Sequence, residues 1–250
     1  MTVEGQHDVD GVLNAGRVVA RVRDAMLQAI EPGMTTAELD ALGSALLDQH
    51  GARSAPRVTY DFPGATCISV NEEAAHGIPG ERVIRAGDVV NVDVSAELNG
   101  YFADTGATIV VPPVSSLKAR LCEATQLALR NAVAEARAGA PLNRIGRAVE
   151  QTAAAYDLRI IRNLGGHGVG RSLHEEPKEI PTWADRSERR TITEGLVFTL
   201  EPFLSLGADW VEESRADGWT LAPPGGEPTV QYEHTLVATK RGPVVVTLAE

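Results

Sequence analysis

Cysteine is scarce in this sequence. The two cysteines among its 250 residues, Cys67 and Cys122, show neither the paired spacing of a metal site nor a disulfide framework. Isolated cysteines of this kind are typical of proteins from a reducing compartment, so we expect a cytoplasmic protein.

Long apolar runs and an excess of basic residues are also missing. No segment approaches the roughly 20 apolar residues that a membrane-spanning helix needs. The first residues are polar and acidic, whereas a secretion signal begins with basic residues and continues with apolar ones. The formal net charge is −11, and an acidic surface repels phosphate backbones. We therefore expect no membrane association and no direct binding of DNA.

The remaining composition is that of an ordinary globular protein. Hydrophobic residues make up 43% and charged residues 23% of the chain, which argues against a disordered or fibrous protein. No low-complexity segment or long linker interrupts the sequence. We therefore expect a single domain over residues 1–250.

Apolar residues at helical spacing, together with helix-end signals, predict four helices. A capping box formed by Thr35 and Glu38 opens the second of them. The helices are predicted at about 12–30, between Thr35 and Gly51, at about 116–136, and in a shorter segment that carries Ile145, Val149 and Ala153. Apolar runs of strand length predict strands at 66–70, 88–95, 107–111, 197–201, 233–238 and 244–248.

The order of these elements repeats along the chain. Gly33 and Leu39 correspond to Gly139 and Ile145 at a separation of 106 residues. Paired helices followed by strands on both sides of residue 112 predict an α+β fold with two related halves, approximately 1–112 and 113–250.

The most informative local pattern is an alternating strand at 90–95 followed by Asn99-Gly100. Alternation of valine with polar residues is the period of a strand with one apolar face. Asn-Gly is the strongest short signal for a two-residue type I′ hairpin turn. Such a turn places Ser95 opposite Asp104, so that Asp93 and Asp104 share a face as diagonal neighbours, with backbones about 7–8 Å apart.

Two carboxylates at that separation can bridge a pair of cations about 3.5–4 Å apart. The small residues Ala103, Thr105 and Gly106 leave room around Asp104. Two solvated aspartates on a polar sheet face are the alternative. The hairpin alone leaves both interpretations open.

Three further candidate ligands lie in the second half. His167 stands between glycines, which allow the backbone to approach a ligand closely. Glu201 and Glu233 each lie in an apolar strand, and a carboxylate is rarely buried there unless it is paired or bound to metal. A salt-bridged core glutamate is the alternative at either position.

These five residues form one oxygen-rich ligand set: Asp93, Asp104, His167, Glu201 and Glu233. Such a set suits two divalent ions such as Mn²⁺, Fe²⁺, Co²⁺ or Zn²⁺. A dinuclear site lowers the pKa of water and stabilises the oxyanion of a hydrolytic transition state. The set therefore predicts a two-metal hydrolase.

Nine short motifs follow one another along the chain: Cys67-Ile-Ser-Val-Asn-Glu, His76-Gly-Ile-Pro, Asn91-Val-Asp-Val, Asp104-Thr, Gly166-His-Gly-Val-Gly, His174-Glu-Glu-Pro, Thr199-Leu-Glu-Pro, Asp217-Gly-Trp-Thr and Gln231-Tyr-Glu-His-Thr. In order and spacing they closely resemble the methionine aminopeptidases of the pita-bread metallopeptidase family. The resemblance covers nearly the whole chain. It implies a pita-bread fold, in which helices cover a central curved antiparallel sheet.

The resemblance also implies an activity and residue roles. All five candidate ligands fall on the family's metal-ligand positions, and the implied reaction is removal of the initiator methionine, with a preference for a small second residue. His76 is expected to hydrogen-bond the scissile peptide nitrogen, and His174 to donate to the scissile carbonyl as charge develops there. Glu201 is expected to take a proton from the attacking water.

Methionine recognition is expected in an apolar S1 slot. Residues at the family's substrate-binding positions are Phe62, Cys67, His76, Leu173, His174 and Trp219. Ordinary core packing is the alternative, especially for Cys67. Thr59 and Leu173 replace residues that are usually aromatic in bacterial relatives, which leaves the strictness of methionine preference open.

The implied partner is the N-terminus of nascent polypeptides. A contact with the ribosome surface would involve Arg186, Arg189 and Arg190, for which a solvated surface is the alternative. We expect a monomer, because the family is often monomeric, and we expect His7, His50 and His234 to be surface or structural residues. An X-Pro aminopeptidase or prolidase-like peptidase and a non-catalytic nascent-chain binding protein are the competing functions.

Overall fold

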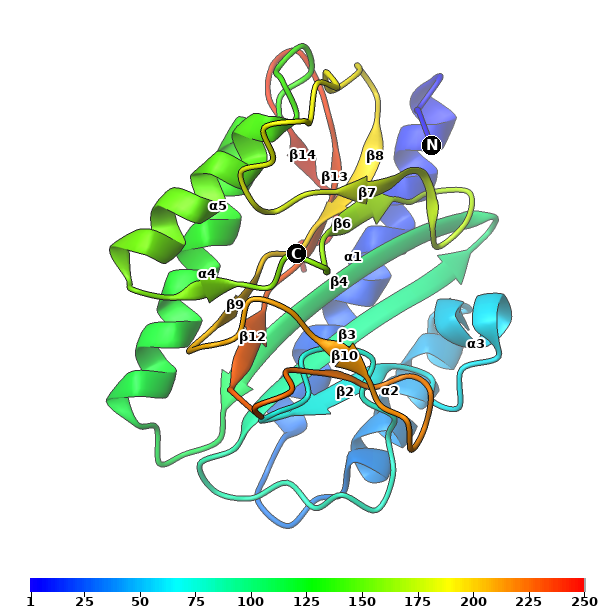
Figure 1. The fold of residues 1–250 in the computed structure, drawn as a ribbon. Helices are drawn as coiled ribbons and strands as arrows, with labels where there is room; N and C mark the ends of the chain where they lie inside the picture. Colours follow the sequence, from blue (N-terminus) through cyan, green and yellow to red (C-terminus); the bar gives the residue numbers. More distant parts are fainter. Residues whose placement is uncertain (250) are drawn as a thin grey trace.

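The computed structural model describes residues 1–249, in which five helices surround a set of mostly antiparallel strands (Figure 1). The helices are α1 (Gln6–Ala29), α2 (Thr36–Gln49), α3 (Ala55–Tyr60), α4 (Ser116–Glu135) and α5 (Asn143–Ala155). The longer strands are β2 (Cys67–Val70), β3 (Val89–Leu98), β4 (Tyr101–Val110), β7 (Glu175–Ile180), β8 (Val197–Leu200) and β13 (His234–Val237). The shorter strands are β1 (Arg53–Ser54), β5 (Arg159–Ile160), β6 (Gly166–Gly168), β9 (Phe203–Ser205), β10 (Glu212–Glu213), β11 (Leu221–Ala222), β12 (Thr229–Gln231) and β14 (Val244–Val245).

The four predicted helices are all present. The capping box of α2 is confirmed, because the Thr35 side chain accepts from Glu38 N and the Glu38 side chain accepts from Thr35 N. Helix α1 begins at Gln6, earlier than predicted, with Asp8 in its first turn, where a carboxylate is favoured by the helix dipole. None of the helices in residues 1–249 is long and apolar enough to cross a bilayer.

Short elements account for most of the differences from prediction. Helix α3 was not predicted, because its six residues carry no helical repeat; Ser54 caps it, and Pro56 lies in its first turn. The strands β5, β6 and β9–β12 have two or three residues each, too few to show a period. The strand predicted at 244–248 is reduced to Val244–Val245.

Two sheets meet at the centre of the molecule. The β3–β4 hairpin pairs with β2 and β1, while a five-stranded sheet has the order β14-β13-β8-β6-β7. The two sheets are joined where Asp104 N donates to Thr235 Oγ1 over 3.0 Å. Helix α1 packs behind the hairpin, and α4 and α5 lie side by side along the other edge (Figure 1).

Helices α1 and α2 contribute to one apolar cluster, and α4 and α5 contribute to another. Val19, Met26 and Leu39 pack against the inner valines of β3. Leu121 and Ile145 pack with Phe198 of β8 in the second cluster. The strands between these two cores are therefore buried on both sides, which permits polar side chains there only where they have partners.

A turn with the same backbone hydrogen bonds occurs twice. Gly33 and Gly139 both have positive φ, 102° and 87°. The matched bonds are Gly33 N to Ile84 O, Ile84 N to Met34 O and Thr36 N to Arg82 O in one turn, and Gly139 N to Ile192 O, Ile192 N to Ala140 O and Leu142 N to Arg190 O in the other. We propose on this ground that residues 1–112 and 113–250 are structural repeats.

Candidate active site

The β3–β4 hairpin has the predicted register. Asn99 and Gly100 both have positive φ, 53° and 83°, as a type I′ turn requires. Ser95 pairs with Asp104, and Asp93 pairs with Gly106, the residue two positions beyond Asp104. Asp93 and Asp104 therefore lie on one face as diagonal neighbours.

The second sheet brings the other three candidate ligands to the same place. His167 is the middle residue of β6, Glu201 follows β8, and Glu233 lies between β12 and β13. Nε2 of His167 lies 3.6 Å from Oε1 of Glu201 and 3.9 Å from Oδ2 of Asp104. Single ligand atoms of Asp104, His167 and Glu233 all lie within 4.8 Å of one another.

The four carboxyl groups of this cluster are crowded; Asp104 and Glu233 are buried, and Asp93 and Glu201 are half-buried. Burial, reinforced by the charge of Asp104, raises the pKa of Asp93 and of Glu233 well above the ordinary range. The same causes raise the pKa of Glu201 to about 8. Burial also raises the pKa of Asp104.

These carboxylates lack a protein cation. In the described part of the chain, no lysine or arginine forms an ion pair with any of the four. Oδ1 of Asp104 and Oε1 of Glu233 are buried and have no hydrogen-bond partner. Orphaned carboxylate oxygens facing an imidazole nitrogen suit divalent metal ions, which accept oxygen and nitrogen ligands together. The residues present therefore fit a metal centre.

Neighbouring groups orient the ligand atoms. The Thr199 hydroxyl donates to Oε1 of Glu201 over 3.0 Å and accepts from the backbone N–H of His167. Gln231 donates to Oε2 of Glu233 over 3.1 Å. Such outer contacts fix the direction of metal ligands.

His167 is held in the form that binds metal. Its Nδ1 lies 3.0 Å from the carbonyl oxygen of Gly168, and a carbonyl can only accept, so Nδ1 carries the proton. Nε2 is thereby left with a free lone pair facing Glu201 and Asp104. Burial lowers the pKa of His167 to about 4, which keeps the imidazole neutral.

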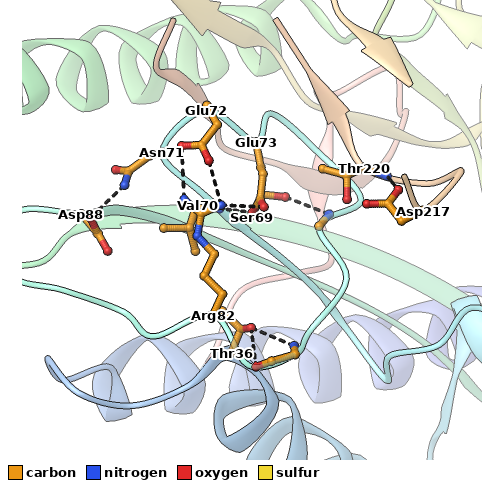
Figure 2. Close-up of polar contacts among 12 residues, drawn as sticks. Thr36, Ser69, Val70, Asn71, Glu72, Glu73, Arg82, Asp88, Asp217 and Thr220 are labelled. Atoms are coloured by element: carbon orange, nitrogen blue, oxygen red, sulfur yellow. Dashed lines mark hydrogen bonds and ion pairs between the residues drawn. The ribbon is translucent and has the colours of Figure 1, made fainter. Parts of the chain in front are cut away.

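His76 lies in the loop between β2 and β3. Arg82 contacts Glu73 over 2.6 Å and Glu72 over 3.0 Å, and Glu73 accepts from Val70 N, as Figure 2 shows. His76 itself has a positive φ of 54°. These contacts hold the loop on both sides of His76 and so restrict where its backbone can lie.

A second constraint acts on the next residue. A Cβ placed on Gly77 would lie 2.2 Å from the carbonyl oxygen of Ile68, and Gly77 N donates to Ser69 Oγ over 3.1 Å. The chain can pass this close to β2 only with glycine at this position.

His174 lies at the start of β7 beside the ligand cluster. Its ring centroid is 3.9 Å from that of His167. Nδ1 of His174 lies 2.7 Å from the hydroxyl of Tyr60. Sequence analysis did not identify Tyr60 as a site residue, although an aromatic side chain next to Thr59 could have indicated it.

Four of the five candidate ligands, all but Glu233, open onto one cavity of about 720 Å³, and His76, His174 and Tyr60 line the same cavity. Phe62, Cys67, Leu173 and Trp219 also line it, and their role in binding substrate stays a prediction. The rings of Phe62 and Trp219 meet edge to face with centroids 5.2 Å apart. Asp217 accepts from the backbone N–H groups of Trp219 and Thr220, and the latter pair is visible in Figure 2.

Thr59 and Leu173, the two positions singled out in the sequence, differ in where they lie relative to the cavity. Leu173 is buried and lines the cavity. Thr59 is exposed and is not among the lining residues, whereas its neighbour Tyr60 is. The aromatic wall at this part of the cavity is therefore supplied from the adjacent position.

The remaining histidines lie outside the cavity lining. Nδ1 of His234 is 2.9 Å from the hydroxyl of Thr247. His7 packs against the ring of Tyr101, and His50 is the C-terminal cap residue of α2. All three have structural or surface positions, as expected.

Comparisons with known proteins show the family to which this chain belongs. The model of metallopeptidase family M24 matches residues 10–240. The chain is 43% identical to methionine aminopeptidase 2 of Bacillus subtilis over 248 residues, 99% of each chain. It is 45% identical to a methionine aminopeptidase of Staphylococcus epidermidis over 248 residues, 99% of this chain and 98% of that one.

A solved structure agrees over the same length. The crystal structure of methionine aminopeptidase from Rickettsia prowazekii superimposes with a TM-score of 0.94 at 32% identity, covering 99% of this chain and 100% of that chain. The expected α+β pita-bread fold is confirmed. The chain belongs to metallopeptidase family M24.

Proposed function

We propose that this protein is a dinuclear metalloaminopeptidase that removes the initiator methionine from nascent polypeptides. The observation that carries the proposal is the cluster of four buried or half-buried carboxyl groups and one neutral imidazole beside a cavity that has an apolar part. Asp93, Asp104, His167, Glu201 and Glu233 would hold two divalent ions, Co²⁺, Mn²⁺, Fe²⁺ or Zn²⁺. When bound, such ions supply a water of lowered pKa and polarise the scissile carbonyl.

The protein's own groups would perform the remaining steps. Glu201 would accept a proton from the attacking water, and the position of its carboxylate beside His167 supports this role. His174 would donate to the scissile carbonyl oxygen as charge develops there, and His76 would hydrogen-bond the peptide nitrogen. Both histidines line the cavity that contains the cluster.

The apolar part of the cavity would select the substrate. Phe62, Cys67, Leu173 and Trp219 would enclose the methionine thioether and orient the scissile bond. Enclosure beyond the scissile bond would favour a small second residue such as glycine, alanine or serine.

The setting proposed for this activity is the cytoplasm, with the enzyme acting as a monomer on chains leaving the ribosome. Both cysteines are free, which is typical of a reducing compartment. Arg186 and Arg189 are exposed and could contact the ribosome surface. Arg190 is already engaged with Glu188 over 2.9 Å, so it would add less to such a contact.

The test is hydrolysis of Met-Gly-Met-Met, Leu-Gly-Met-Met and Gly-Pro-Met-Met by chelated protein, before and after addition of Co²⁺ or Mn²⁺. Metal-dependent release of methionine alone is the expected result. Release of leucine at a similar rate would remove the strict specificity but keep the metallopeptidase. Activity only on Gly-Pro would indicate an X-Pro peptidase, and metal binding without activity would indicate a binding protein.

A further inference from the structure

Tyr60 is the last residue of α3 and stands at the cavity next to His174. Its hydroxyl is 2.7 Å from His174 Nδ1, and the two rings are tilted by 54° with centroids 5.6 Å apart. Among residues 1–249, no other side chain hydrogen-bonds the imidazole of His174. The two residues are 114 positions apart in the chain, so this contact is made by tertiary structure.

The backbone that carries Tyr60 is firmly held. Asp61, with φ 56°, ends α3 immediately after it. Ser54 begins the helix by accepting from Arg57 N, and its hydroxyl donates to the carbonyl of Ala65 over 2.7 Å. Only the side-chain torsions of Tyr60 therefore remain to set the position of the hydroxyl.

Asp40 of α2 anchors the chain on the other side of α3. Its carboxylate accepts from the backbone N–H groups of Ala65 and Thr66, and it lies 3.6 Å from the guanidinium of Arg57. A helix fixed at both ends can present a hydroxyl in one place, as a positioning group must.

The proposed role of His174 sets the direction of this hydrogen bond, because a protonated phenol can either donate to Nδ1 or accept from Nδ1–H. A neutral imidazole has one N–H and one acceptor nitrogen, and the partner of one nitrogen determines which of the two carries the proton. Burial, assisted by the charge of Asp104, raises the pKa of Tyr60, so the phenol keeps its proton and can donate. A phenol that donates to Nδ1 places the imidazole proton on Nε2.

The other nitrogen of His174 points away from Tyr60. The ring of His174 lies against that of His167, beside the ligand cluster, and lines the same cavity. Nε2–H is thereby directed away from the phenol, and it is the N–H of His174 that remains available to a bound peptide.

We propose that Tyr60 is a positioning residue that donates to Nδ1 of His174 and so holds the proton on Nε2, the atom that hydrogen-bonds the scissile carbonyl. The inference rests on the proposed function for the role of His174. It assigns to α3 a part in the reaction beyond lining the substrate slot. The ring of Tyr60 contributes to the slot, and its hydroxyl orients His174.

The first experiment separates the hydroxyl from the ring. Tyr60→Phe removes only the hydroxyl, and we expect kcat on Met-Gly-Met-Met to fall about tenfold with KM within about twofold. Tyr60→Ala also removes the ring and should raise KM in addition. Tyr156→Phe is the matched control, because within residues 1–249 the hydroxyl of Tyr156 hydrogen-bonds Glu123 and the residue lies outside the cavity lining. Equal kcat for Tyr60→Phe and Tyr156→Phe would overturn the proposal.

A double-mutant cycle tests whether Tyr60 acts through His174. In a His174→Ala background, Tyr60→Phe should change kcat by less than about twofold, since the group to be oriented is gone. An undiminished tenfold loss in that background would show that the hydroxyl acts elsewhere and would reject the proposal.

A spectroscopic measurement needs no activity. Long-range ¹H–¹⁵N correlation spectra of the protein loaded with Zn²⁺, at pH 8, report which nitrogen of each histidine is protonated, and His174→Ala identifies the His174 signals. We expect protonated Nε2 and acceptor Nδ1 in the wild type, and a mixture of tautomers in Tyr60→Phe. A proton on Nδ1 of the wild type would refute the hydrogen bond as drawn. Wild-type protein with the expected spectrum but no release of methionine would instead reject the proposed function.

Discussion

Removal of metal should destabilise this protein in a way that can be predicted in sign and size. An ion present at about 100 times its dissociation constant stabilises the folded state by about 2.7 kcal/mol. For a protein of this size, each kcal/mol corresponds to about 2–4 °C in Tm, so loss of one such ion should lower Tm by about 5–11 °C. Thermal unfolding followed by circular dichroism, with chelator and then with added Mn²⁺, measures the shift.

Replacement of Asp104 should affect the Tm of the metal-free protein and the Mn²⁺-dependent increase in Tm in opposite directions. Asp104 raises the pKa of Asp93, Glu201 and Glu233 by its charge, and its Oδ1 has no partner. Asp104→Asn removes that repulsion from the metal-free protein, whose Tm should stay constant or rise. It also removes a ligand, so the increase in Tm on adding Mn²⁺ should fall to less than half.

The stability of the metal-free protein should depend on pH in a definite direction. Glu201 has a pKa of about 8 in the folded, metal-free protein and about 4.3 when unfolded. Between about pH 4 and pH 8, Glu201 is therefore protonated in the folded protein and ionised in the unfolded protein. Its contribution to the free energy of unfolding is fully present below about pH 4 and is lost as the pH rises through 8. The increase in Tm caused by Mn²⁺ should therefore be larger at pH 8 than at pH 6.

Asp209→Asn is the control, because Asp209 is an exposed carboxylate outside the cavity lining. It should leave the Mn²⁺-dependent shift unchanged. The reasoning is refuted if wild-type protein shows the same Tm with chelator and with Mn²⁺, or if Asp104→Asn retains the full increase.

Three further substitutions test the surroundings of the site. Gly77→Ala should lower the free energy of unfolding by about 1–3 kcal/mol in urea titrations and reduce kcat/KM, because the added Cβ overlaps the Ile68 carbonyl next to His76. Thr35→Ala removes the capping box of α2 and should cost about 1 kcal/mol in the same titrations, with kcat unchanged. Phe62→Ala should raise KM for Met-Gly-Met-Met by roughly tenfold, since it removes one wall of the slot and the edge-to-face contact with Trp219. Full activity in Gly77→Ala, a loss of kcat in Thr35→Ala, or an unchanged KM in Phe62→Ala would contradict the respective argument.

The hairpin shows what could be predicted from local sequence. An Asn-Gly turn requires positive φ at both residues, and the two-residue loop then fixes every cross-strand pair behind it. Asp93 and Asp104 could therefore be placed on one face before any tertiary contact was known. The helix starting at Thr36 was equally predictable, because its capping box is a contact between residues three apart.

The convergence of His167, Glu201 and Glu233 was predicted by buried polarity and by resemblance, but their geometry follows from the order of the strands. Leu200 and His234 are paired across the antiparallel strands β8 and β13. Glu201 follows Leu200 and Glu233 precedes His234, so the pairing brings the two carboxylates together. Strand β6 pairs on the other side of β8 and carries His167 to the same edge. Three-residue strands such as β6 show no period, so no local pattern could give these pairings.

Sequence alone therefore determined the four longer helices, the hairpin and the candidate ligands, because turn chemistry, capping and the cost of burying a carboxylate act within a few residues. The tertiary structure decided that Tyr60, and not Thr59, reaches the cavity, and that its hydroxyl meets His174. That contact depends on how α3 is anchored against Asp40 and Ala65 and on where β7 begins. It joins residues 114 positions apart, and only the packing of the two sheets and their helices brings such residues within hydrogen-bonding distance.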